Sequence, residues 1–199
     1  MNPPLPRVRV LFDETAIAQR NEEIARAIAD QPLQNLLVVA VLKGSFMFAA
    51  DLIRALHRAG LAPQVEFIHL SSYRAATVSS GQVAILRDVE SEVRGRDVLL
   101  IDDILESGRT LVYAKDLLMA RGARRVLTTV LLEKPGKRAV TMDADYVGFT
   151  CRTCSWSATA WTWPTPSGSC PMSASSITAT ATRICSTRAD RPPPEALKR

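Results

Sequence analysis

Hydrophobic positions in the first 150 residues alternate between a helical spacing and short unbroken apolar runs. The helical spacing predicts three helices, at residues 13–30, 45–60 and 110–120. The first is capped by Asp13 or Thr15 and carries Ile17, Ile24 and Ile28 on one face. The unbroken apolar run at 36–41 is typical of a strand covered on both sides, and 97–101 is predicted to be a second buried strand. Residues 65–70 and 125–132 are also predicted to be strands, and a fifth strand begins or ends in 146–149.

Short strands separated by helices of three or four turns predict an α/β domain with a central parallel β-sheet flanked by helices. Ligands bind such sheets in the loops at the carboxyl ends of the strands. Candidate chemistry is therefore expected in the loops at 42–45, 102–110 and 133–138.

Composition separates residues 1–150 from residues 151–199. All four Cys and all three Trp fall in the last 49 residues, which also hold eight Ser, eight Thr and six Pro. That segment carries six basic and two acidic residues, so most of the net charge of +5 belongs to it. We expect a core domain at 1–150 and a poorly ordered tail at 151–199. Because the first 150 residues are close to neutral, nucleic acid is not the expected partner.

Membrane and secretory classes are not favoured. No stretch approaches the ~18–20 apolar residues of a membrane span, and residues 1–10 contain Pro and Arg without an apolar core. Cys151 and Cys154 have the spacing of metal ligands, but no second close pair accompanies them. We therefore expect a cytoplasmic protein with no zinc site in the tail.

The segment 102–110 combines two kinds of chemistry. Asp102 and Asp103 follow a predicted buried strand, and adjacent carboxylates can accept hydrogen bonds from the vicinal diol of a ribose. The turn at 107–110 enters a helix, where backbone N–H groups and hydroxyls suit a phosphate. The segment thus favours a phosphorylated ribose over its alternative, an acidic turn with a helix cap.

Four segments in order carry a family resemblance. Residues 98–111 resemble the phosphoribosyl-pyrophosphate signature of type I phosphoribosyltransferases. Residues 41–46 resemble the pyrophosphate loop of hypoxanthine (hypoxanthine-guanine) phosphoribosyltransferases, and 71–81 resemble their catalytic flap. Residues 131–138 with 145–149 resemble their purine-side strand and loop. The resemblance spans about residues 13–149 and implies the type I phosphoribosyltransferase fold.

On the phosphoribosyl side, the resemblance assigns the roles of residues 102–110. Asp102 and Asp103 would hold the ribose hydroxyls with Mg²⁺ nearby, although the family usually has Glu at the first position. Glu106 would be the general base on purine N7, in place of the usual Asp. The 5′-phosphate would be cradled by Ser107, Gly108, Arg109 and Thr110.

Other residues would contact pyrophosphate and purine. Leu42, Lys43 and Gly44 would approach pyrophosphate, and Ser72 and Tyr73 would belong to the flap. Lys134 would donate to the 6-oxo group of the purine, and Arg138 would pair with pyrophosphate. Taken alone, the two basic side chains would be read as solvated surface charges; the co-occurrence of the motifs favours the functional roles.

The implied activity is purine salvage, in which phosphoribosyl passes from phosphoribosyl pyrophosphate to hypoxanthine and guanine, giving IMP or GMP and pyrophosphate. The resemblance also implies Mg²⁺ as cofactor and a homodimer or homotetramer. Two alternatives stay open: an RNA-binding regulator built on the same fold, and a catalytically dead remnant that binds phosphoribosyl pyrophosphate. The near-neutral charge of residues 1–150 weighs against the regulator.

We interpret the amino-acid sequence of the tail as the product of a shift in the reading frame. The family continues with a hood segment of the type Pro-Asp-x-Phe-Val-Val-Gly-Tyr-Gly-x-Asp-x-Ala, which is absent after Phe149. We join the last base of each codon to the first two of the next and take the TCN and CGN codon families for Ser and Arg. Trp156-Ser157 then encodes Val, Trp161-Thr162 encodes Asp and Trp163-Pro164 encodes Ala. From residue 151 the shifted frame permits Pro-Asp-Leu-Phe-Val-Val-Gly-Tyr-Gly-Met-Asp-Leu-Ala. We therefore expect a disrupted hood and little activity in the chain as written.

Overall fold

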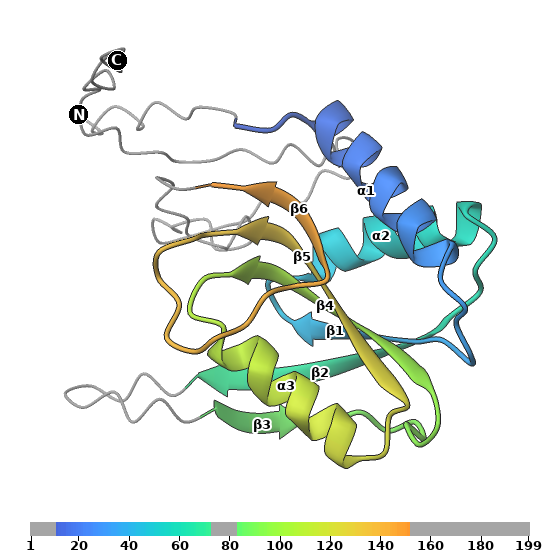
Figure 1. Ribbon diagram of the computed structural model, residues 1–199, viewed down its shortest axis with the longest axis vertical. Helices are drawn as coiled ribbons and strands as arrows, with labels where there is room; N and C mark the ends of the chain where they lie inside the picture. The colour runs from blue at the N-terminus through green and yellow to red at the C-terminus, as the bar shows by residue number, and fades with distance from the viewer. Residues whose placement is uncertain (1–10, 73–82, 152–199) are drawn as a thin grey trace, which may run out of the picture.

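The computed structural model describes residues 11–72 and 83–151, which form three helices and one six-stranded sheet (Figure 1). The helices are α1 (Glu14–Ala29), α2 (Phe46–Arg58) and α3 (Arg109–Ala120). The strands are β1 (Leu37–Leu42), β2 (Gln64–Ser72), β3 (Val83–Arg87), β4 (Asp97–Leu105), β5 (Arg125–Glu133) and β6 (Tyr146–Thr150).

The sheet has the strand order β3-β2-β1-β4-β5-β6. All neighbouring strands are parallel except β2 and β3, which are antiparallel. The carboxyl ends of β1, β4 and β5 therefore lie at one edge of the sheet, which brings together the loops that follow them.

Helices cover both faces of the sheet (Figure 1). On one face α1 and α2 pack against the side chains of Val38 and Ala40, and on the other α3 packs in the cluster that contains Leu37 and Val39. Successive residues of a strand point to opposite faces, so a strand between two helical layers must be apolar throughout. This explains why the predicted strand at 36–41 is an unbroken apolar run.

The edge strand β6 is fastened to the start of the chain. Arg20 of α1 donates from Nε to the carbonyl of Gly148 at 3.0 Å and from Nη2 to that of Val147 at 2.8 Å. The ring of Phe12 stacks on that of Phe149 with centroids 4.0 Å apart. These contacts hold β6 in place up to the last residues that the structure describes.

The predicted helices and apolar strands are confirmed, including the cap of α1, where Asp13 Oδ1 accepts from the amide of Ala16 at 2.8 Å. The expected central parallel sheet flanked by helices is confirmed, and β3 adds an antiparallel strand that the pattern did not predict. In β3, Ile85 and Leu86 are 38% and 61% exposed. Apolar residues in this edge strand are therefore not a sign of burial.

Two predicted segments fall largely outside the structure's coverage. The expected flap retains only Ser71 and Ser72, at the end of β2. The expected tail retains only Cys151. None of the helices within residues 11–72 and 83–151 is both long and apolar enough to cross a membrane.

Candidate active site

Two adjacent carboxylates stand near the carboxyl end of β4. The strand runs through Leu105, so Asp102 and Asp103 are part of it, whereas the sequence pattern ended the strand before them. Both are buried, at 8% and 9% exposed, and the amide of Asp103 donates to Asp102 Oδ1 at 2.9 Å. Strand geometry therefore fixes the backbone of both acids.

Burial first, and then the negative charge of Asp103, raise the pKa of Asp102 well above its ordinary value. A buried acid pair of this kind is stabilised by hydroxyl donors or by a cation. Carboxylate oxygens are also the hard ligands that Mg²⁺ prefers. The donor set of Asp102 and Asp103 therefore fits both a ribose diol and a magnesium ion.

The loop after β1 lies against this acid pair. A Cβ built on Gly44 would sit 2.8 Å from Cγ of Asp103, closer than a side chain allows, so only glycine fits there. Lys43 beside it is exposed, and the peptide bond between Leu42 and Lys43 is cis. The structure thus brings residues 42–44 next to the carboxylates, as the parallel sheet predicts.

The segment after β4 forms a turn that opens α3. Gly108 has φ +82°, in the left-handed region, and precedes the first helical residue, Arg109. The first amides of a helix lack partners within it and carry partial positive charge. Ser107 and Thr110 add hydroxyl groups to this turn, and Ser107 Oγ accepts from the amide of Arg109 at 3.4 Å, so the turn has the donors that a phosphate requires.

Glu106 lies between two ammonium groups. Its Oε1 is 3.1 Å from Nζ of Lys134 and 3.2 Å from Nζ of Lys137. Hydrogen bonding from Lys134, and secondarily from Lys137, lowers the pKa of Glu106 although partial burial opposes this. The predicted base and the predicted purine donor are therefore in direct contact in the structure.

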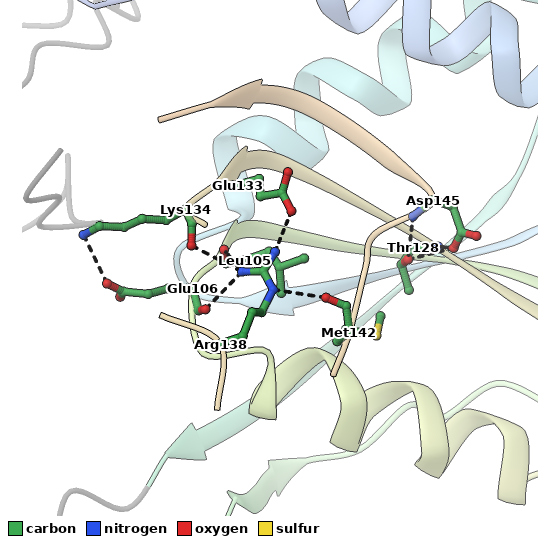
Figure 2. A network of polar contacts seen from close by, with 8 residues as sticks. All are labelled: Leu105, Glu106, Thr128, Glu133, Lys134, Arg138, Met142 and Asp145. Carbon is green, nitrogen blue, oxygen red and sulfur yellow. Dashed lines mark hydrogen bonds and ion pairs between the residues drawn. The ribbon is translucent and has the colours of Figure 1, made fainter. Parts of the chain in front are cut away.

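The loops after β4 and β5 are joined by main-chain bonds. The amide of Lys134 donates to the carbonyl of Leu105 at 3.0 Å, and that of Ala139 donates to the carbonyl of Ser107 at 2.9 Å. Further along, Asp145 Oδ2 accepts from the amide and hydroxyl of Thr128 at 2.8 and 2.7 Å, which fixes the entry to β6 (Figure 2).

Arg138 fills the space between these loops (Figure 2). Its guanidinium donates to main-chain carbonyls of both loops and to the carboxylate of Glu133. The pyrophosphate contact expected for Arg138 stays a prediction. In the structure the guanidinium is bound to protein acceptors instead.

Most residues predicted for the site gather at this edge, namely 42–44, 102–103, 106–110, 134 and 138. Ser72 ends β2, and Tyr73 lies outside the described residues. Sequence reasoning missed Lys137 and Glu133 as site residues. The density of charge in 133–138 was the only available signal, and it does not say which charges meet.

Comparisons with known proteins agree with this geometry. The chain matches the model of the phosphoribosyl transferase domain family over residues 8–167. It is 41% identical over 140 residues to the hypoxanthine-guanine phosphoribosyltransferase of Streptococcus agalactiae serotype V, covering 70% of this chain and 76% of that protein. The chain therefore belongs to the phosphoribosyltransferase family, and its relatives place it among the hypoxanthine-guanine members.

Solved structures show the same fold. The hypoxanthine phosphoribosyltransferase of Trypanosoma cruzi in complex with the product IMP superposes with a TM-score of 0.69 at 36% identity, covering 77% of this chain and 85% of that chain. The Staphylococcus aureus hypoxanthine phosphoribosyltransferase gives a TM-score of 0.67 at 34% identity, covering 73% and 78%. The fold is therefore that of a type I phosphoribosyltransferase, as the sequence predicted.

Some relatives are much longer. The bifunctional protein TilS/HprT of Listeria innocua is 44% identical over 142 residues, which are 71% of this chain. The chain spans only 22% of that relative's length.

Proposed function

We propose that this protein transfers phosphoribosyl from phosphoribosyl pyrophosphate to hypoxanthine and guanine, producing IMP or GMP and pyrophosphate in purine salvage. The observation that carries the proposal is the 3.1 Å contact between Lys134 and Glu106 beside the turn at 107–110. It supports the proposal because the residues proposed as 6-oxo donor and as carboxylate base lie at the same edge of the sheet as the turn proposed to bind phosphate.

Each end of the nucleotide has its own protein partners. The amides and hydroxyls of residues 107–110 bind the 5′-phosphate, and Asp102 and Asp103 accept hydrogen bonds from the ribose hydroxyls. Residues 42–44 lie beside pyrophosphate. Asp102 and Asp103 would hold Mg²⁺, which would supply positive charge that favours departure of pyrophosphate.

Purine binding changes the surroundings of the base. Lys134 donates to the 6-oxo oxygen and thereby leaves Glu106 with Lys137 as its ammonium partner. The pKa of Glu106 then rises from its lowered value, which makes the carboxylate a better acceptor for the proton on purine N7. The substrate thus improves the base that acts on it.

The choice among purine substrates follows from Lys134. A 6-oxo group accepts the hydrogen bond of a buried ammonium, whereas the 6-amino group of adenine presents donors to it. A site built for one hydrogen bond rejects the analogue that leaves its buried group unpaired. We therefore propose 6-oxopurines as substrates.

The test is transfer to hypoxanthine, guanine and adenine, measured as nucleotide formed per enzyme with phosphoribosyl pyrophosphate and Mg²⁺. It uses the 199-residue chain and a version with one nucleotide restored near codon 150. We expect IMP and GMP in both, in small amount from the first, and negligible AMP. Efficient adenine transfer would remove Lys134 from its role. Absence of transfer in both proteins, with salt-dependent RNA binding instead, would favour the regulator.

We also propose that residues 151–199 are translated out of frame. The support is the shifted reading described above, which restores a hood motif directly after β6. The nucleotide sequence around codon 150 tests this. An insertion or deletion relative to the frame of a related gene is expected, and an uninterrupted frame through the tail would contradict it.

By the same family likeness, we propose a cytoplasmic enzyme that forms a homodimer or homotetramer. Sedimentation equilibrium of the frame-restored protein tests the assembly, and a monomer at micromolar concentration would contradict it.

A further inference from the structure

Arg138 has a guanidinium that is bound on several sides (Figure 2). Its Nη1 donates to the carbonyls of Leu105 at 2.8 Å and Glu106 at 3.0 Å. Its Nε donates to the carbonyl of Met142 at 3.1 Å, and its Nη2 donates to Glu133 Oε1 at 2.6 Å. A longer contact of 3.4 Å joins Nη1 to the carbonyl of its own loop, at residue 134.

These acceptors come from both sides of the site. Leu105 is the last residue of β4, and Glu106 leads into the turn at 107–110, here called the phosphate turn. Residues 134 and 142 belong to the connection from β5 to β6. The planar fork of an arginine can bridge several carbonyls at fixed angles, which the single ammonium of a lysine cannot do. Arg138 therefore ties the segment that carries the base to the segment that carries the purine donor.

Glu133 binds the Arg138 guanidinium through Nη2. The side chains of Arg138 and Glu133 are 21% and 25% exposed, so their ion pair is shielded from water more than a surface pair. A charge-assisted bond of 2.6 Å at that burial restricts the rotation of the guanidinium. Pyrophosphate could reach the Arg138 donors only by displacing these acceptors.

We propose that Arg138, anchored by Glu133, is a positioning residue that sets the base Glu106 against Lys134 across the two loops, and does not contact pyrophosphate. The inference rests on the proposed function for the identity of the ligand. It predicts that Arg138 and Glu133 act as one unit, and that nucleotide binding depends on both.

The experiment compares Arg138→Lys, Glu133→Gln and their double variant in the 199-residue chain. Glu22→Gln is the matched control, because it breaks another inter-element pair, with Arg58 at 2.5 Å, on the distant α1–α2 surface. Two quantities are measured: amide hydrogen exchange of peptides spanning 104–108, and affinities for IMP and for magnesium pyrophosphate by calorimetry.

The positioning role predicts that both single variants speed exchange at 104–108 and weaken IMP by about tenfold, the loss of one charge-assisted hydrogen bond. The double variant should lose no more than the worse single one, because the two residues act together. Magnesium pyrophosphate affinity should stay within about twofold, a difference too small for the loss of a charged contact. The control should change neither quantity.

A pyrophosphate contact predicts a different result, which would overturn the proposal: weaker pyrophosphate binding in Arg138→Lys, with Glu133→Gln unchanged or tighter. Unchanged exchange in both single variants would overturn it as well. Should Arg138→Lys not fold, Glu133→Gln keeps the arginine and decides alone. Wild-type protein that binds neither IMP nor pyrophosphate contradicts the proposed function, while the exchange measurement still tests the link between the loops.

Discussion

Glu106 is the residue whose surroundings matter most to the proposed chemistry. Two ammonium groups lie within 3.2 Å of one of its carboxylate oxygens, and they lower its pKa. Glutamate is one methylene longer than the aspartate usual in the family, and in this structure it spans the distance to both lysines. The ionised state of the proposed base is thus favoured by the same loop that is proposed to recognise the purine.

The first prediction concerns this base. Glu106→Gln in the frame-restored protein should lower turnover by ~10²–10⁴-fold, because the amide cannot accept the N7 proton. Affinity for phosphoribosyl pyrophosphate should change little, since the phosphate and ribose contacts are proposed to come from other residues. The measurement is kcat together with the substrate dissociation constant. Retention of more than about a third of wild-type turnover would exclude the base role, because it falls far short of a general-base effect.

The second prediction concerns the pKa of Glu106. Lys137→Met removes one of the two ammonium groups, so the carboxyl pKa should move up toward its ordinary value. Because the pKa of Glu106 is lowered in the folded protein, the stability it contributes is present at neutral pH and is lost as pH falls through that lowered value. Loss of Lys137 should move this acid transition to higher pH.

Carboxyl-selective NMR titration of the ligand-free protein measures that pKa directly, and Lys137→Arg serves as the charge-conserving control. A Glu106 pKa that is identical in the wild type, Lys137→Met and Lys137→Arg would show that Lys137 does not influence the base.

At the scale of elements, the turn into α3 depends on Gly108. A Cβ there would meet Cγ2 of Val140 at 3.1 Å and Cβ of Met142 at 3.3 Å, and φ is +82°. The turn is therefore restricted both by its backbone conformation and by the loop that packs on it. Gly60 has a similar φ of +89°, but nothing lies within 4 Å of a Cβ added there. Gly60 is therefore restricted by backbone conformation alone, whereas Gly108 is restricted by conformation and by packing.

The third prediction uses this pair. Gly60→Ala should cost roughly 1–2 kcal/mol of unfolding free energy from the left-handed conformation alone. Gly108→Ala should cost more and should also weaken IMP binding, because the phosphate turn must shift away from Val140. Urea denaturation and calorimetry measure the two effects. Equal destabilisation of both variants, with IMP affinity preserved, would show that packing at Gly108 is unimportant.

Hydrophobic patterning was a good guide to elements buried on two faces and a poor guide at the sheet edge. Strand β1 and residues 98–101 of β4 are unbroken apolar runs because helices cover both sides, and β5 is apolar between its ends except at the buried Thr128 and Thr129, so these strands are visible in sequence. Strand β3 exposes Leu86 and pairs only with β2 among the described strands, and no local pattern marks such a strand. The end of β4 was missed for a related reason, because the part of the strand that approaches the site contains the polar pair Asp102 and Asp103.

At the scale of the molecule, the site joins loops that are far apart in sequence. The motifs at 42–44, 102–110 and 134–138 predicted the participants, and the strand order explains why they meet. The contacts of Glu106 with Lys137 and of Arg138 with Glu133 could not be predicted. They depend on the path of the 133–140 loop over β4, which neither propensity nor spacing determines.

The fourth prediction concerns the tail. It tests the central claim that residues 1–150 are the core of a hypoxanthine-guanine phosphoribosyltransferase whose remaining segment is encoded in another reading frame. On the proposal of a shifted frame, the segment 151–199 replaces the aromatic residue expected to stack on the purine, a contact worth ~1–3 kcal/mol between aromatic groups and bases. It also removes an aspartate expected to bind Mg²⁺ and an apolar segment expected to cover the sheet edge beyond β6.

The measurement is the rate of IMP formation from hypoxanthine, phosphoribosyl pyrophosphate and Mg²⁺, made side by side on the 199-residue chain and on the protein with one nucleotide restored near codon 150. We predict a rate at least about a hundredfold higher in the restored protein, as the combined loss of stacking and leaving-group neutralisation implies, together with a higher Tm. Equal specific activity and equal Tm in the two proteins would contradict the account.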